Sequence, residues 1–163
     1  PTASDYWHLD EMVIVIRGQR HWLWRAVDNE GEVLDFLVQS RRNAKAALKL
    51  MRKLLKKQGW PPTRLVTDKL RSYHVAIRAL GLTAEHIDNK RANNRAENSH
   101  QPVLRRERKQ QRFKSPGSAP RFLNVHSATY NNFYIQRHLL NRSTFKRLRT
   151  DAFNVWKTAA AEV

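Results

Sequence analysis

The chain has 163 residues and a mass of 19.2 kDa, the usual size of one domain. Its 40% hydrophobic residues, 5 glycines and 6 prolines are typical of a globular protein and exclude a collagen-like or wholly disordered chain. It contains no cysteine, which excludes disulfide scaffolds, thiolate metal sites and cysteine nucleophiles and favours a reducing, cytoplasmic location.

The charge is strongly positive, with 31 lysines and arginines against 14 acidic residues and a net charge of +17. Residues 41–149 carry 27 of these basic residues and only five of the acids. Such a surface attracts a polyanion, so we expect nucleic acid as the partner. The alternative is that the lysines and arginines only solvate helix faces.

A membrane partner is not expected. The longest apolar run, Met12–Ile16, is far shorter than the roughly 20 residues of a membrane helix. The first residues lack the charged and apolar regions of a signal peptide. Because Pro1 opens the chain almost directly before a strand-like segment, we also expect that an upstream portion is missing.

The first 39 residues predict three β-strands. Alternation of side chains over Trp7–Ile16 places Asp10 on one side of a strand whose two sides are both largely apolar, as in the centre of a sheet. Short turns separate this strand from two more, His21–Val27 and Val33–Gln39. Three strands joined by short turns predict an antiparallel meander.

The period then changes to that of a helix over residues 44–55. Asn43 is its predicted N-cap, and Gly59 with the following prolines its stop. A short buried strand, Arg64–Thr67, comes next and ends at Asp68.

A helix over residues 70–80 and a strand over residues 83–87 complete the sheet. Strand–helix–strand crossovers are right-handed and make the later strands parallel. The predicted fold is therefore α/β, with a mixed five-stranded sheet of three antiparallel and then two parallel strands, flanked by helices.

The remaining chain predicts helices. A basic helix runs from Asn94 toward Phe113 and is kinked at Pro102. Another begins near Pro120, with an inner stripe that comprises Phe122, Val125, Thr129, Phe133, Gln136 and Leu140. Thr150 or Asp151 is expected to cap a short C-terminal helix. We therefore divide the chain into a core over residues 1–140 and an extension over 141–163 that packs on it as a short helix.

Three carboxylates form the candidate site. Asp10 needs a cation or hydrogen-bond donors on its buried strand side, Asp68 lies at the carboxyl end of a parallel strand, and Glu97 lies early in the basic helix. Carboxylates that converge from separate elements suit Mg²⁺, and two ions so held suit phosphoryl transfer. The alternatives are that Glu97 only caps a helix with Asn94, Asp68 is a turn or cap residue, and Asp10 pairs with an arginine.

The sequence around these acids resembles the DDE-type transposases of bacterial insertion sequences, in the branch called the insertion-sequence-six family. The resemblance extends from about residue 7 to about residue 140, and it rests on three blocks in the family's order: Trp7-His8-Leu9-Asp10-Glu11, Val66-Thr67-Asp68-Lys69 with Tyr73, and Asn93-Asn94-Arg95-Ala96-Glu97-Asn98-Ser99-His100-Gln101-Pro102 with Arg105-Arg106. It implies a ribonuclease H-like catalytic core whose metal ligands and catalytic residues are Asp10, Asp68 and Glu97. The family also has a DNA-recognition segment upstream of this core, which fits the abrupt opening.

The resemblance implies a polynucleotidyl transferase that depends on Mg²⁺ or Mn²⁺, with two ions expected. It would nick transposon ends and join them to target DNA. A homodimer or higher assembly is expected in the active complex, with the protein in the bacterial cytoplasm on the nucleoid. Two other interpretations stay open: a nuclease of the same fold that cuts without joining, and a basic DNA-binding module whose carboxylates form salt bridges.

DNA contacts are expected from the basic helix and its surroundings. The candidates are Lys69, His100, Arg105, Arg106, Lys109, Arg112 and Lys114. His100 lies three residues after Glu97, close enough to orient a ligand or donate to a phosphate. Many relatives have a basic residue seven positions after the glutamate, where this chain has Leu104.

Overall fold

A computed structural model describes residues 5–68, 70–89, 93–109, 113–115, 117–133 and 142–161. Inside the helices, it does not describe the side chains of residues 94, 95, 97, 99, 106–109, 132, 142 and 159–161. The helices and strands in chain order are β1 (Tyr6–Ile16), β2 (Gln19–Asp28), β3 (Val33–Gln39), α1 (Ala44–Gln58), β4 (Arg64–Thr67), α2 (Arg71–Ala79), β5 (Glu85–Ile87), α3 (Asn94–Lys109), α4 (Ser118–Phe133) and α5 (Arg142–Ala161).

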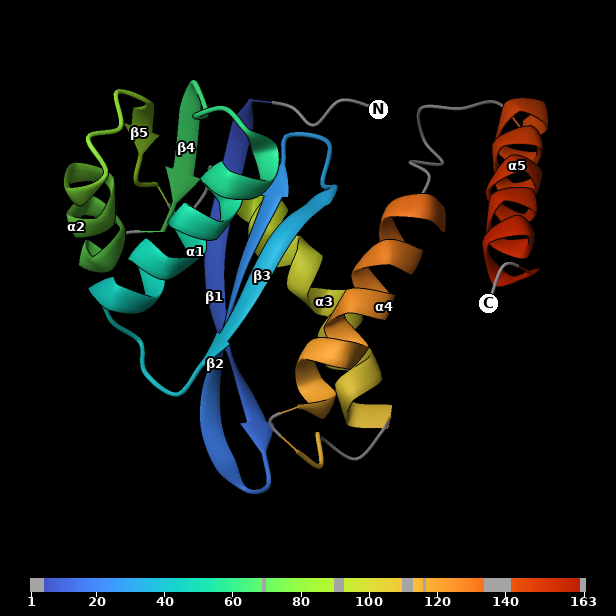
Figure 1. Ribbon diagram of the computed structural model, residues 1–163, viewed down its shortest axis with the longest axis horizontal. Helices are drawn as coiled ribbons and strands as arrows, with labels where there is room; N and C mark the ends of the chain where they lie inside the picture. The colour runs from blue at the N-terminus through green and yellow to red at the C-terminus, as the bar shows by residue number, and fades with distance from the viewer. Residues whose placement is uncertain are drawn as a thin grey trace. The chain divides into compact units, whose positions relative to one another are not determined.

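The predicted mixed sheet of five strands is confirmed. Its spatial order is β3-β2-β1-β4-β5 (Figure 1). β1 pairs with β2 and β2 with β3 in antiparallel fashion, while β4 is parallel to both β1 and β5. β1 is thus the central strand, as its two largely apolar sides predict.

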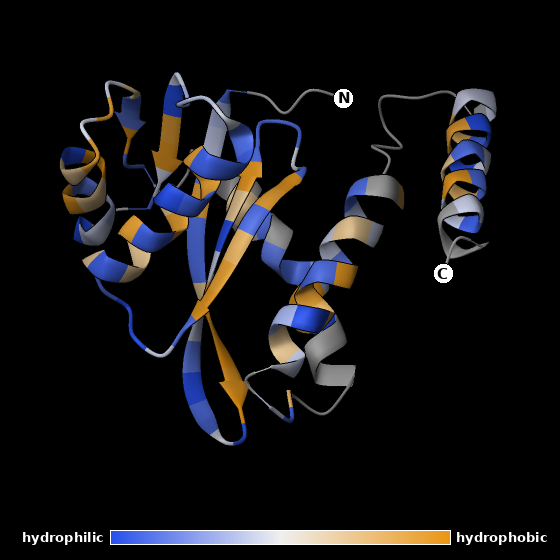
Figure 2. Cartoon of the chain, in the orientation of Figure 1, coloured by the Kyte–Doolittle hydropathy of each residue, from blue (hydrophilic) through white to orange (hydrophobic). Residues whose placement is uncertain are grey.

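Helices cover both faces of the sheet, as Figure 1 shows for α1 on one face and α3 on the other. The face toward α1 and α2 holds a buried cluster of Trp7, Leu9, Trp24, Ala26, Leu34, Ala46, Ala47, Leu50, Met51, Leu54, Leu65, Tyr73 and Ala76. The other face holds Ile14, Ile16, Leu23, Phe36, Val103, Phe113, Ala119 and Leu123. In Figure 2, the orange of hydrophobic residues dominates β3 and β4, whereas blue stretches interrupt β1 and β2.

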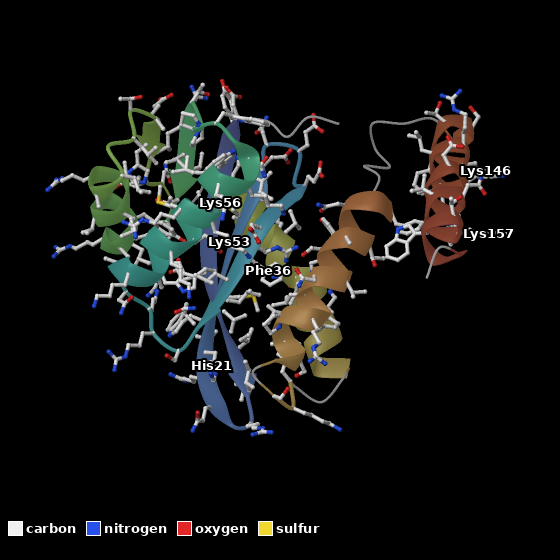
Figure 3. All side chains as sticks on the ribbon, viewed as in Figure 1. His21, Phe36, Lys53, Lys56, Lys146 and Lys157 are labelled. Carbon is white, nitrogen blue, oxygen red and sulfur yellow. The ribbon has the colours of Figure 1, made fainter. Side chains whose placement is uncertain are left out.

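The sequence signals that bound α1 are both present in the structure. The Asn43 side chain accepts a hydrogen bond from the Ala46 amide at 3.0 Å, which satisfies a donor that the first helical turn leaves open. Gly59 has φ +81°, a left-handed conformation that ends the helix at low steric cost. Lys53 then ties α1 to the edge strand β3, since its ammonium donates to the Phe36 carbonyl at 3.0 Å (Figure 3).

The register between β1 and β4 sets up the candidate site. Leu9 lies opposite Thr67, and this is the last pair of the two strands. The next residue on each strand is an aspartate, so Asp10 and Asp68 stand level at the point where β4 ends. Neighbouring strands are about 4.8 Å apart, which allows the two carboxylates to meet.

Two predicted helix details differ in the structure. α3 ends at Lys109, and Phe113 forms an isolated bridge with Ile16 of β1, so it is fixed by pairing with the sheet rather than by helix formation. Val125 is 63% exposed and does not belong to an inner stripe of α4. Gln136 and Leu140, also assigned to that stripe, lie outside the described residues.

The predicted cap of the C-terminal helix is wrong. α5 begins at Arg142, so Thr150 and Asp151 both lie inside it. The Thr150 hydroxyl donates to the Lys146 carbonyl at 3.0 Å, a bond within the helix, so this hydroxyl does not cap a helix end. None of the described helices combines the length and apolar character required to cross a membrane.

Contacts divide the chain into two compact units, residues 1–124 and 125–163, with the boundary inside α4. The first unit contains the whole sheet, α1, α2 and α3. The predicted core over residues 1–140 and the packing of residues 141–163 on it stay predictions.

Leu50 tests the role of α1 as the cover of the sheet, because its side chain is completely buried in the cluster on that face. L50A should lower the free energy of unfolding by about 2–5 kcal/mol, since it leaves a cavity that the rigid sheet fills only partly. Urea denaturation measures the change. K49A, at the exposed neighbouring position, should stay within about 0.5 kcal/mol of the parent. Equal losses in the two variants would contradict the packing described here.

Candidate metal centre

Three carboxylates meet where β4 ends. Asp10, Glu11 and Asp68 each offer an oxygen, and these three atoms lie within 4.8 Å of one another. They border a pocket of about 310 Å³ whose lining residues are Asp10, Glu11, Met12, Asp68, Asn93, His100, Gln101 and Leu104. The predicted meeting of Asp10 and Asp68 is therefore present in the structure.

Asp10 is paired with a histidine. His100 Nε2 of α3 lies 3.3 Å from Asp10 Oδ2, and the His100 side chain is only 5% exposed. Arg25 of β2 stands directly opposite Asp10 in the antiparallel register and is also buried. His100 was predicted among the DNA contacts; the structure places it beneath the surface, where it faces Asp10.

Asp68 makes one local hydrogen bond and one ion pair. Its Oδ1 accepts a hydrogen bond from the Leu70 amide at 3.0 Å. The alternative interpretation of Asp68 as a turn residue is therefore correct for this one oxygen. The other oxygen lies 3.6 Å from Arg42 Nη2, and the Asp68 side chain is 28% exposed. One side of this carboxylate therefore stays open to the pocket.

Glu11 is the acidic residue that sequence reasoning missed. Its side chain is completely buried, and its two oxygens receive different donors: Arg42 donates to Oε1, and the Tyr73 hydroxyl donates to Oε2 at 2.9 Å. The argument applied to Asp10, that a carboxylate on a buried strand side needs partners, holds equally for its neighbour.

Burial raises the pKa of Glu11 to about 7, and the nearby charge of Asp68 adds to this rise. The hydrogen bonds from Arg42 and Tyr73 oppose it. Burial also raises the pKa of Tyr73 well above its usual value, so its hydroxyl remains a donor.

Asn93 closes one side of the pocket. Its side-chain amide nitrogen donates at 2.7 Å to the carbonyl of Leu9, the β1 residue of the last β1–β4 pair. Its Oδ1 is buried, and no donor within the described part of the chain reaches it. A water molecule or hydroxyl held in the pocket would satisfy this oxygen.

The remaining predicted site residues are placed less completely. Glu97 belongs to α3 by its backbone, as do Arg106 and Lys109, but the side chains of these three are outside the described part. Lys69 and Arg112 are not described at all. Arg105 and Lys114 are exposed, as DNA contacts require, and their role stays a prediction. Leu104 lines the pocket, so the position at which many relatives have a basic residue is apolar here and faces the site.

A family model described as the DDE domain, of the IS240 transposase type, matches residues 4–138. The chain belongs to this family of insertion-sequence transposases. The predicted resemblance is thus confirmed, and Asp10 and Asp68 lie in the matched region.

Individual similar proteins support the same family assignment. The chain is 33% identical over 102 residues to the transposase for insertion sequence-like element IS431mec of Staphylococcus aureus. This alignment covers 60% of this chain and 45% of that protein. It is 36% identical over 80 residues to an uncharacterized protein of Yersinia pseudotuberculosis, covering 48% of this chain and 75% of that one. The chain thus spans less than half the length of the Staphylococcus transposase.

A solved structure shows the fold. The cryo-EM structure of the simian T-cell lymphotropic virus intasome in complex with the PP2A regulatory subunit B56 gamma has a chain that matches 80% of this one. The match has a TM-score of 0.60 and 14% identity, and it covers 50% of that chain. Together with the strand order, this confirms the predicted ribonuclease H-like fold.

The raised pKa of Glu11 makes stability depend on pH. The unfolded chain releases this proton near the ordinary pKa of 4.5, whereas the folded chain keeps it until about 7, so folding is favoured at low pH and loses this contribution as pH rises through 7. In the presence of EDTA, the free energy of unfolding of the parent relative to E11Q should fall by up to about 3 kcal/mol between about pH 4.5 and about pH 8.

Urea denaturation at several pH values measures this difference. The histidines titrate in both proteins, so the subtraction removes their contribution. A difference that is constant across the range would contradict the raised pKa.

Proposed function

We propose that this chain is the catalytic domain of a DNA transposase that hydrolyses phosphodiester bonds at transposon ends and transfers the strand to target DNA. The observation that carries the proposal is the register that sets Asp10 level with Asp68 at the end of β4, in a chain of the DDE family. The net charge of +17 supports DNA as the substrate, since it attracts a polyanion to a pocket that is itself acidic.

The donor set fits a divalent cation. Carboxylate oxygens are the ligands that Mg²⁺ and Mn²⁺ prefer; Asp10 and Asp68 each offer one, within 4.8 Å of each other, and Asn93 Oδ1 is an acceptor for a coordinated water. We assign the ligands to Asp10, Asp68 and Glu97, which lies three residues before His100 on α3. Two such ions would activate the attacking oxygen and stabilise the leaving one.

The chain's own residues orient this centre. His100 holds Asp10 from the α3 side and limits the directions in which the carboxylate can point. Asn93 occupies the β1 backbone acceptor at Leu9 and keeps the pocket wall closed.

The phosphate backbone would be held by the basic residues beyond the pocket. We assign this role to Lys69, Arg105, Arg106, Lys109, Arg112 and Lys114. Phosphate contacts position a duplex without reading its sequence, so this unit would hold DNA of any sequence. His100 is removed from this group, because it is buried and faces Asp10.

The working complex would contain at least two copies of the protein, because transposition joins two DNA ends. We place it in the bacterial cytoplasm, on the nucleoid.

The decisive variant is D10N, which keeps the shape of the side chain but removes a metal-binding charge. With Mn²⁺ and supercoiled plasmid DNA, D10N should lower the cleavage rate by about 100-fold or more, since outer-shell changes alone cost up to that factor. Its affinity for duplex DNA should be equal to or higher than that of the parent, because a negative charge is lost. Gel analysis of nicking and fluorescence anisotropy measure the two effects.

D151N is the matched control, because it removes one exposed carboxylate and changes the net charge equally. It should cleave at the parental rate. A binding module without catalysis would show no cleavage by the parent, and a nuclease would cut but not join labelled ends to the plasmid.

A further inference from the structure

Arg42 lies beside the metal centre but belongs to none of the assigned groups. It precedes the Asn43 cap of α1, and 38% of its side chain is exposed. Its guanidinium touches two of the three clustered carboxylates, Glu11 and Asp68. The sequence contains 31 lysines and arginines, and nothing in the local pattern distinguishes this one.

One edge of the Arg42 guanidinium is fixed by the protein. Nε donates to Glu11 Oε1 at 2.8 Å, and Nη2 donates to the same oxygen. Glu11 is in turn held by Tyr73, and the guanidinium lies over the ring of Trp22, 5.0 Å from its centroid. A buried carboxylate and an aromatic ring therefore hold a side chain that would otherwise sample many rotamers.

The other edge of the guanidinium is available. An arginine has five N–H donors in a planar fork, and Glu11 engages only the edge formed by Nε and Nη2. Nη2 also lies 3.6 Å from Asp68 Oδ2, which is an ion pair beyond hydrogen-bond distance. Within the described part of the chain, Nη1 has no partner.

The negative charge of the pocket favours a cation at this position for binding a phosphate. Three carboxylates within 4.8 Å of one another repel a phosphodiester that approaches the pocket. A guanidinium oriented at the pocket edge offsets this repulsion, and its planar fork fits two phosphate oxygens better than an ammonium does.

We propose that Arg42 binds a phosphate of the DNA strand beside the carboxylate cluster, and that Glu11 is the positioning residue that holds the guanidinium for this contact. This rests on the proposed function and deepens it by naming a strand-binding group at the reacting end of the pocket. Glu11 thus serves the site through Arg42.

A double-mutant cycle tests both parts. Affinity of the chain for a fluorescein-labelled DNA duplex is measured by anisotropy in EDTA over a series of salt concentrations, for the parent, R42A, E11Q and the double variant. R42A should weaken binding several-fold and lower the slope of log affinity against log salt by about 1, the effect of one lost phosphate contact. E11Q should weaken binding in the parent, because loss of the anchor that holds Arg42 outweighs the removal of one repelling charge, and it should not weaken binding in R42A.

R41A is the matched control, since Arg41 is the exposed preceding arginine and its loss changes the net charge equally. E11Q should weaken binding by the same factor in R41A as in the parent. Thermal melts followed by circular dichroism check that each variant is folded. R42A leaves Glu11 the hydrogen bond from Tyr73, so it decides the phosphate contact even if E11Q does not fold.

Parental affinity and salt slope in R42A would overturn the phosphate contact. Equal effects of E11Q with and without Arg42 would overturn the role of Glu11. Because no metal or cleavage is involved, failure here is distinct from failure of the proposed function, which plasmid cleavage by the parent and D10N decides.

Discussion

The architecture depends on satisfying neighbouring carboxylates at the centre of a sheet that is covered on both faces. Asp10 and Glu11 follow each other on β1, so the strand alternation directs them toward opposite faces. Each face supplies a different partner: His100 from α3 reaches Asp10, while Tyr73 from α2 and Arg42 before α1 reach Glu11. The helices that cover the sheet are thereby tied to the acidic site as well as to the core.

Much of the fold could be predicted because local chemistry determines it. Asn43 and Gly59 bound α1 through backbone hydrogen bonds that involve only nearby residues, and the strand Arg64–Thr67 has the predicted limits. Thr150 misled the prediction, since the same hydroxyl that caps a helix can bond to a carbonyl one turn earlier inside it.

The candidate site could be predicted only in part. Asp10 and Asp68 follow from the motif and from strand ends, but the fact that they stand level is a property of pairing between residues 58 positions apart. Glu11 belongs to the same motif block, yet its burial depends on Arg42 and Tyr73, whose approach requires the tertiary structure. Leu104 shows the converse: its departure from the family pattern is visible in the sequence, while its place in the pocket wall is not.

The brevity of β4 has a structural consequence. Because its pairing with β1 stops at Leu9, the next stretch of the central strand has lost its neighbour on that side, and the hollow occupies the missing space. The length of β4 therefore determines where Asp68 lies relative to Asp10. One residue inserted into β4 would turn Asp68 to the opposite side of the sheet, and one more paired rung would fill the hollow with backbone. The position of Asp68 beside Asp10 therefore depends on the number of residues in β4 and not on the length of the loops around the pocket.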